Sequence, residues 1–431
     1  MSTTTFDDLL THFREKSVST RNQGDHLEAL TQQFLLKDGT QAPQYEKVWL
    51  WKDWPQRNNY ADLGIDLVAQ RYDGGLAAIQ CKFYSPEHTM AKSDIDSFLS
   101  ASSRRPFTER IVVSTTDKWS KPAEAMLENQ HIPVKLIGLN DFRNSNIDWD
   151  TYRFDAPEGS LETYEKKKPR PHQHDAIKNT LAGFETHDRG KLIMACGTGK
   201  TFTALRLAEK FAEQKGHAQI LFMVPSLALM SQSVQEFSNE TTTEMHAYAV
   251  CSDVKVGRRV TEDITDVQLH DLQIPATTDG KTLVEAMGRR ILSEGLTVVF
   301  STYQSVDAVI EAQKAGLPDF DLIICDEAHR TTGVQLAGEQ QSHFTKIHDN
   351  NLVRGDKRLY MTATPRLFND ETKNKAKESE AVLASMDDET LFGPDAADWF
   401  RRGSRKGIAG RLQSVSPVSY THLTLPTSDL V

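Results

Sequence analysis

The chain has 431 residues, of which 38% are hydrophobic and 26% charged, which predicts two domains or three rather than one globular core. Acidic residues outnumber basic ones 60 to 50, so the formal charge of −10 excludes a nucleic-acid binder that works through overall positive charge. The absence of a long apolar run, of a leader-like start and of paired cysteines excludes membrane-spanning and secreted classes and favours a cytoplasmic protein.

The first 155 residues predict a small α/β domain with a mixed sheet. Helical spacing appears over Asp25–Leu36, and the Asp-Gly-Gly sequence at 73–75 predicts a hairpin turn. The other elements that the pattern predicts, in chain order, are strands at 45–51, 63–69 and 76–83, a helix at 93–102, a strand at 110–114, a helix at 121–130 and a strand at 134–139.

A polar run with two prolines at 156–171 predicts a linker. Over 172–400, apolar strands alternate with amphipathic helices, which is typical of a parallel sheet covered on both faces. The strands are expected at 192–195, 220–224, 297–301, 322–325 and 358–362, and the helices at 201–214 and 228–237. The stretch 241–294 is longer than such a domain needs, and the sequence assigns it no role. Residues 401–431 lose all periodicity, and we expect this tail to be non-native.

The strongest local signal is MACGTGKT at 194–201, between a predicted strand and a predicted helix. Glycines let backbone amides wrap a triphosphate, a lysine binds the β and γ oxygens, and a hydroxyl binds magnesium. These nucleotide-binding roles are predicted for Gly197, Thr198, Gly199, Lys200 and Thr201. Met194 stands where the usual pattern has its first glycine, so a plain strand-to-helix turn is the alternative.

A second motif, DLIICDEAH at 321–329, is an apolar strand that ends in two acids. Because both acids leave the strand at the edge where phosphates bind, we predict that Asp326 holds magnesium and that Glu327 polarises the attacking water. Taken alone, such a pair is typical of a helix N-terminus. The phosphate loop upstream favours the nucleotide site.

These motifs, with VPS at 224–226, STYQS at 301–305 and LYMTATP at 359–365, resemble the first RecA-like lobe of a superfamily-two DEAH helicase. They are most similar to the translocase subunits of restriction enzymes, type III among them. The resemblance implies ATP as cofactor, nucleotide contacts from Arg170 and Gln173, with Gln173 reading adenine, and coupling of hydrolysis to strand movement by Thr362 and Thr364. For His329, coupling between ATP and nucleic acid and a plain helix-end histidine stay equally open. Contacts to the nucleic-acid backbone are implied for Pro225, Ser226, Thr302 and Gln304.

The N-terminal domain carries another polar constellation, on its predicted hairpin. Asp66 and Gln80 lie on neighbouring strands, and Gln80 and Lys82 are two residues apart, so they share a face. An acid, an amide oxygen and the carbonyl of Cys81 can hold magnesium, and a lysine beside the metal can orient a water for attack on a phosphodiester. Glu28, on the preceding helix, is a further candidate ligand or water-positioning group. A solvated hairpin face is the alternative.

The sequences GIDLVA at 64–69 and IQCKF at 79–83 resemble the Mrr-type branch of the PD-(D/E)xK nucleases, in which glutamine replaces the second acid. Such a domain ahead of a helicase is similar to the start of single-chain, type I-like restriction enzymes. The fold expected is therefore a restriction-endonuclease-like α/β domain followed by one RecA-like parallel-sheet lobe, with the second lobe absent. Without that lobe's arginine fingers, we expect ATP turnover by this chain to be impaired.

The function expected is that of an ATP-dependent restriction endonuclease fragment, with magnesium and ATP as cofactors and double-stranded DNA as partner. The native chain is expected to continue into the second helicase lobe, and into a methyltransferase and a target-recognition domain. One alternative is a helicase or remodelling ATPase whose first domain only binds DNA. Another is a defective fragment that binds ATP or DNA without turnover.

Overall fold

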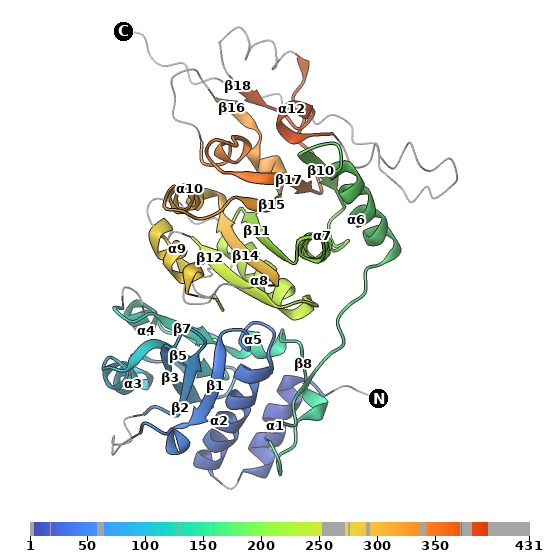
Figure 1. Ribbon diagram of the computed structural model, residues 1–431. Helices are drawn as coiled ribbons and strands as arrows, with labels where there is room; N and C mark the ends of the chain where they lie inside the picture. Colours follow the sequence, from blue (N-terminus) through green and yellow to red (C-terminus); the bar gives the residue numbers. More distant parts are fainter. Residues whose placement is uncertain are drawn as a thin grey trace.

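The computed structural model describes residues 4–17, 19–57, 64–127, 130–157, 159–251, 272–274, 276–289, 294–335, 342–370, 372 and 382–394. Two α/β units lie one above the other, and an extended segment along one side joins them (Figure 1). The predicted tail at 401–431 lies outside the described residues. No helix in the described ranges has the length and hydropathy that crossing a bilayer requires.

The N-terminal unit is built on a five-stranded mixed sheet of order β1-β2-β3-β5-β7. β1, β2 and β3 pair antiparallel, whereas β3, β5 and β7 pair parallel, which confirms the predicted mixed sheet. The strands are β1 (Tyr45–Leu50), β2 (Leu67–Arg71), β3 (Leu76–Lys82), β5 (Phe107–Ser114) and β7 (Val134–Ile137). The turn between β2 and β3 has Gly74 at φ 86°, a conformation that glycine adopts without strain.

Side-chain alternation along these strands fills two separate cores. Leu67 and Ile79 point to the face covered by α1 (Phe6–Lys16) and α2 (Thr20–Lys37). Val68 and Ala78 point to the face covered by α3 (Asp96–Ala101) and α4 (Lys121–Leu127). The helix α5 (Leu139–Arg143), the short strand pairs β4 (Thr89–Met90) with β6 (Lys118–Trp119), and β8 (Ile147–Asp148) with β9 (Glu162–Thr163), complete the unit.

Two of the boundaries that differ from the sequence pattern bear on the hairpin and the edge strand of this sheet. The strand expected at 134–139 ends at Ile137, because α5 begins directly after Gly138. The Asp141 carboxylate accepts a hydrogen bond from the Gly138 amide (2.7 Å) and so stabilises this helix start. The strand expected at 63–69 begins at Leu67, so Asp66 lies just before it. The Asp66 amide still donates to the Ile79 carbonyl at 2.8 Å, which keeps Asp66 opposite Gln80.

The second unit has a seven-stranded sheet of order β10-β17-β15-β11-β14-β12-β13 in which every pair is parallel, as predicted. The strands are β10 (Arg189–Ile193), β11 (His217–Val224), β12 (Met245–Val250), β13 (Ala276–Thr277), β14 (Gly295–Thr302), β15 (Phe320–Cys325) and β17 (Gly355–Thr362). The helices are α6 (Pro171–Phe184), α7 (Lys200–Lys215), α8 (Leu227–Glu240), α9 (Gly280–Gly288), α10 (Val306–Lys314) and α12 (Glu389–Phe392). The remaining strands are β16 (Gly333–Gln335) and β18 (Val382–Ala384), which pair antiparallel.

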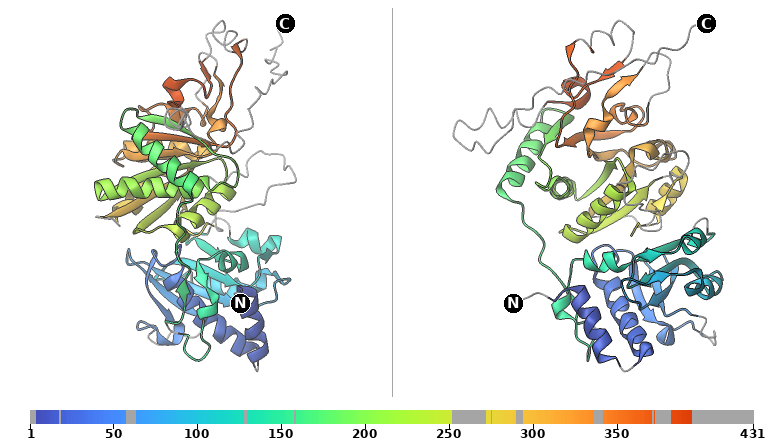
Figure 2. Two further views of the ribbon diagram at one scale, coloured as in Figure 1. Left: turned by 90° about the vertical axis from the view of Figure 1, so that its right-hand side faces the viewer. Right: turned by 180° about the vertical axis from the view of Figure 1, so that it is seen from behind.

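The segment at 156–171, our proposed linker, contacts both units. Glu162 and Thr163 form β9 against β8 of the N-terminal unit. Lys166 Nζ then donates to the Asn239 carbonyl (2.6 Å) and the Lys167 amide donates to the Glu240 carboxylate (2.8 Å), both at the end of α8. The turned views of Figure 2 show the same segment running from the N-terminal unit to α6.

A buried histidine makes the stability of the second unit sensitive to acid. His348 donates from one ring nitrogen to the Thr331 carbonyl (3.1 Å) and accepts from the Tyr360 hydroxyl at the other (2.9 Å), and burial lowers its pKa to about 4. Its pKa in the unfolded chain is about 6.5. Below that pH only the unfolded chain takes up the proton, so the unfolding free energy should fall by up to about 3 kcal/mol as the pH falls to about 4.

A His348→Gln variant lacks this titrating group. Urea unfolding at a series of pH values should therefore show the stability gap between parent and variant closing as the pH falls from 7 to about 4. A gap that stays constant over this range would mean that folding does not lower the pKa of His348.

Candidate active sites

The glycine-rich segment at 194–199, which we call the phosphate loop after its predicted role, joins β10 to α7, as the sequence predicts. Gly197 (φ 74°) and Gly199 (φ 82°) adopt the left-handed conformation, and Gly199 caps the N-terminus of the 16-residue helix α7. The Thr198 hydroxyl donates to the Ala195 carbonyl at 2.6 Å and so closes the turn. The first amides of a long helix, together with a turn that only glycine adopts easily, form a backbone cradle for anions.

The two acids of the second motif lie opposite this loop. Lys200 Nζ is 3.7 Å from Glu327 Oε1, which joins the phosphate loop to the end of β15. Asp326 is 6% exposed, and its Oδ1 has no hydrogen-bond partner. Burial, together with the charge of Glu327, raises the pKa of Asp326 to about 6. A buried carboxylate oxygen without a partner, beside a lysine, fits the binding of a divalent cation with a nucleotide.

Glu327 is the one non-glycine residue of the described ranges with a positive φ, 48°. A side chain in this conformation is strained, and such strain is often found at functional sites. Its carboxylate lies between Lys200 and His329, whose Nδ1 is 3.3 Å away. The turn after β15 therefore directs the Glu327 carboxylate toward Lys200, at the end of the phosphate loop.

His329 connects the acids to β17. Its Nδ1 lies 3.1 Å from the Thr362 hydroxyl, which in turn accepts from the Thr364 amide (3.1 Å). Burial lowers the pKa of His329, so the neutral ring is favoured. A chain of contacts thus runs from Glu327 through His329 to Thr362, and the coupling role of His329 stays a prediction.

Gln173 braces the phosphate loop. Its Nε2 donates to the Thr198 carbonyl (2.9 Å), and its Oε1 accepts from the Arg170 amide (2.8 Å). The His172 ring also donates to the Thr198 carbonyl (3.1 Å), a contact that the sequence did not indicate. A Cβ on Gly199 would collide with the Gln173 amide nitrogen. Adenine recognition by Gln173, and nucleotide contact by Arg170, stay predictions.

The residues expected to touch the nucleic-acid backbone are partly engaged within the protein. Ser226 caps α8 by accepting from the Leu229 amide (3.4 Å), and the buried Thr302 hydroxyl donates to Ser305 Oγ (3.0 Å). Pro225 is buried, whereas Gln304 is partly exposed. Their contacts to nucleic acid stay predictions. A neighbour that the sequence did not indicate, Tyr303, donates from its hydroxyl to the Asp326 carbonyl at 2.8 Å and supports the acidic turn.

The N-terminal constellation forms where β2 begins and β3 ends. Gln80 is 3% exposed; its Nε2 donates to the Gly64 carbonyl (2.9 Å), while its Oε1 is buried without a hydrogen-bond partner. Asp66 Oδ2 accepts from the Cys81 amide at 2.7 Å. In a strand the amide and carbonyl of one residue point to the same side, so the Cys81 carbonyl faces Asp66 as well.

The charges of Asp66, Glu28 and Lys82 act on the Cys81 thiol. Burial raises the pKa of Cys81 well above its usual range, and the charges of Asp66 and Glu28 raise it further, whereas Lys82 lowers it. The Glu28 charge, on α2, thus acts on a residue of the hairpin, and its role as a ligand or water-positioning group stays a prediction. Three convergent His, Cys, Asp or Glu side chains do not occur in the described ranges. A magnesium site here would therefore depend on oxygens of Asp66, Gln80 and the Cys81 carbonyl.

Comparison with known proteins identifies both units. Residues 36–159 match the restriction endonuclease family, and residues 166–367 match the family described as type III restriction enzyme, res subunit. The solved structure of the ATP-dependent Type ISP restriction-modification enzyme LlaBIII bound to DNA is 38% identical, covers 91% of this chain and 24% of its own, and gives a TM-score of 0.75.

Two more distant curated relatives each match about half of this chain. A probable helicase of African swine fever virus is 29% identical over 57% of this chain and 23% of its own. The type I restriction enzyme EcoAI endonuclease subunit of Escherichia coli is 26% identical over 46% of this chain and 20% of its own. The chain thus spans less than a quarter of the length of these relatives. The matches confirm that the chain joins a restriction endonuclease domain to a helicase domain of the type III res-subunit family, with the Type ISP restriction-modification enzymes as structural relatives.

Proposed function

We propose that the chain is part of an ATP-dependent restriction endonuclease, in which the first domain hydrolyses DNA with magnesium and the second uses ATP to move along DNA. The observation that carries this proposal is the similarity to LlaBIII, because it includes both domains in one match over 91% of this chain. That enzyme is ATP-dependent and was solved bound to DNA. Double-stranded DNA is accordingly the partner that we propose.

In the first domain, Asp66, Gln80 and the Cys81 carbonyl would hold magnesium, because they offer hard oxygens and the Gln80 oxygen lacks a partner in the protein. The cation would supply a Lewis acid for the scissile phosphate. Lys82 would hold the attacking water and offset the charge that develops on the phosphate. Glu28 would orient the same water from the helix side.

In the second domain, the amides around Gly197 and Gly199 and the Lys200 ammonium would bind the triphosphate of ATP. Thr201 and Asp326 would hold its magnesium, and Glu327 would orient the attacking water. The contact between His329 and Thr362 offers a path by which the state of the nucleotide changes β17. That path would couple hydrolysis to movement along DNA.

The nuclease assignment is tested by replacing Asp66 with asparagine. Because asparagine lacks the charge that holds the cation, we expect cleavage of plasmid DNA by the chain with magnesium or manganese to fall at least about a hundredfold. Asp96→Asn, which removes an exposed carboxylate from α3 of the same domain, is the matched control.

Two results would count against this assignment. If Asp66→Asn cuts DNA at the parental rate with its fold intact, the hairpin residues are only a polar face. If the folded parent binds DNA but does not cut it with either metal ion, the alternative gains in which the first domain only binds DNA.

A further inference from the structure

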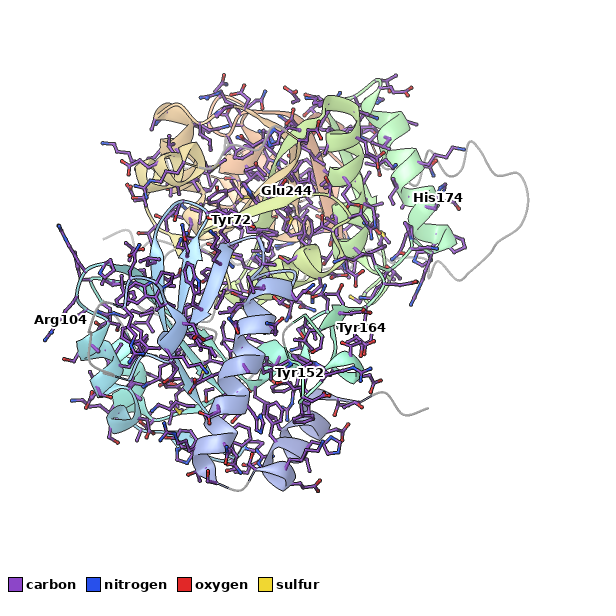
Figure 3. All side chains as sticks on the ribbon, turned by 60° about the horizontal axis from the view of Figure 1, so that its bottom comes forward. Tyr72, Arg104, Tyr152, Tyr164, His174 and Glu244 are labelled. Atoms are coloured by element: carbon purple, nitrogen blue, oxygen red, sulfur yellow. The ribbon has the colours of Figure 1, made fainter. Side chains whose placement is uncertain are left out.

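The contact between the two domains contains a buried polar cluster. Tyr72, at the turn between β2 and β3, and Glu244, just before β12, lie on either side of this boundary (Figure 3). A pocket of about 60 Å³ there is lined by both domains, with Arg71 and Tyr72 from one and Ser238 and Met245 from the other. The boundary is thus a packed contact with room for water.

The centre of the cluster is Gln273, in the 241–294 stretch to which the sequence assigns no role. Its neighbours Leu272 and Ile274 are 3% and 5% exposed and pack into the core of the helicase domain. The backbone of Gln273 is therefore fixed from both sides. Its side chain, 9% exposed, reaches the nuclease domain.

Gln273 makes three hydrogen bonds across the boundary. Its Nε2 donates to the Leu136 carbonyl (2.8 Å), its Oε1 accepts from Gln41 Nε2 (2.8 Å), and its own carbonyl accepts from Gln44 Nε2 (2.6 Å). Leu136 belongs to β7, the edge strand of the nuclease sheet. The Gln273 side chain thus forms hydrogen bonds both to the open edge of the nuclease sheet and to the loop after α2.

The nuclease side of the contact is held in place by its own buried groups. Lys135 Nζ donates to Gln41 Oε1 (3.0 Å) and to the Tyr45 hydroxyl (2.6 Å), and lies 3.6 Å from Glu109. Asp38 Oδ1 accepts from the Gln41 amide (3.1 Å). Because these groups already fix Gln41, the Gln41 side chain loses little freedom when it contacts Gln273.

Further contacts lie beside the cluster. Asn239 Nδ2 donates to the Asn144 carbonyl at 3.0 Å, which joins the end of α8 to the nuclease domain. A Cβ on Gly39 would collide with the Ser238 carbonyl, so the two backbones approach as closely as a glycine allows. The domains therefore fit each other at several points, and the linker is not their only connection.

We propose that Gln273 locks the nuclease domain onto the helicase domain, so that the two move as one body. This inference does not depend on the activity of either domain. Gln273→Ala would remove the partners that the Leu136 carbonyl and Gln41 Nε2 have in a buried place, and a buried polar group that is neither paired nor hydrated is unfavourable. The domains should then separate, since separation lets water reach both groups.

Trypsin digestion of the full chain tests the lock, because residues 166–168 of the linker are lysines and Lys166 and Lys167 are bonded to α8 in the docked state. We expect cleavage after Lys166 or Lys167 to be at least fivefold faster in Gln273→Ala, and the radius of gyration from X-ray scattering to rise. Gln214→Ala, at an exposed position of α7, should behave as the parent.

Gln44→Ala approaches the same contact from the nuclease side and should also speed cleavage of the linker. Thermal unfolding and circular dichroism separate undocking from loss of fold, because an undocked chain keeps its helix content. Linker cleavage at the parental rate and an unchanged radius of gyration in folded Gln273→Ala would overturn the proposal.

Discussion

Replacing Lys200 with alanine is expected to lower the affinity of the chain for ATP at least about tenfold, because a hydrogen bond from a charged group contributes about 1.5–3 kcal/mol. The Lys200 ammonium lies at the start of α7 and is 3.7 Å from Glu327. Its loss removes a donor to the phosphates and also leaves the Glu327 carboxylate facing them without a counter-charge. Both effects weaken binding of an anion.

Titration of a fluorescent ATP analogue measures this affinity directly, without any need for turnover. Lys210→Ala is the matched control, because Lys210 lies on the same helix, is half exposed, and pairs with Glu213 on the surface (2.5 Å). The control should bind as the parent does. Equal affinity in Lys200→Ala and Lys210→Ala would mean that the loop at 194–201 does not bind the triphosphate.

The elements that the sequence predicted well are those with a strong local pattern. The strand, loop and helix around Gly197 and Gly199 follow from apolar runs and from glycines that permit one turn, so their positions were predicted to within three residues. The order of the strands was not predictable in this way. β11 lies between β15 and β14, and the alternation of apolar strands and helices along the chain does not encode that order.

Interactions between distant segments were beyond the sequence for a related reason. A glutamine has the same local propensity whether it is exposed or buried, and nothing near Gln173 or Gln273 indicates the carbonyl that each one meets. Lys135 is only 7% exposed, although it is a charged residue in the short strand β7. Partners of this kind become visible only when the fold places two separate segments together.

The side-chain amide of Gln80 is oriented by its hydrogen bond to the backbone at Gly64. The Gly64 carbonyl accepts from Gln80 Nε2 at 2.9 Å, so the amide oxygen is the atom left for a cation. Gly64 has φ 83°, and a Cβ there would approach Gln80 Nε2 to 3.2 Å, so a glycine at position 64 leaves room for this contact. A carboxylate at position 80 would place an oxygen against this carbonyl oxygen instead of a donor.

We therefore expect Gln80→Glu to cleave DNA at least about tenfold more slowly than the parent, because two facing acceptors in a part-buried place, without a proton between them, cost about 1–3 kcal/mol. The resemblance to nucleases with two acids would suggest the opposite. Initial cleavage rates at saturating magnesium decide between the two. Gln56→Glu adds the same charge at an exposed position of the domain and should leave the rate unchanged. A Gln80→Glu variant as fast as the parent would show that the Gly64 carbonyl does not orient this side chain, and that charge at position 80 matters more than the donor.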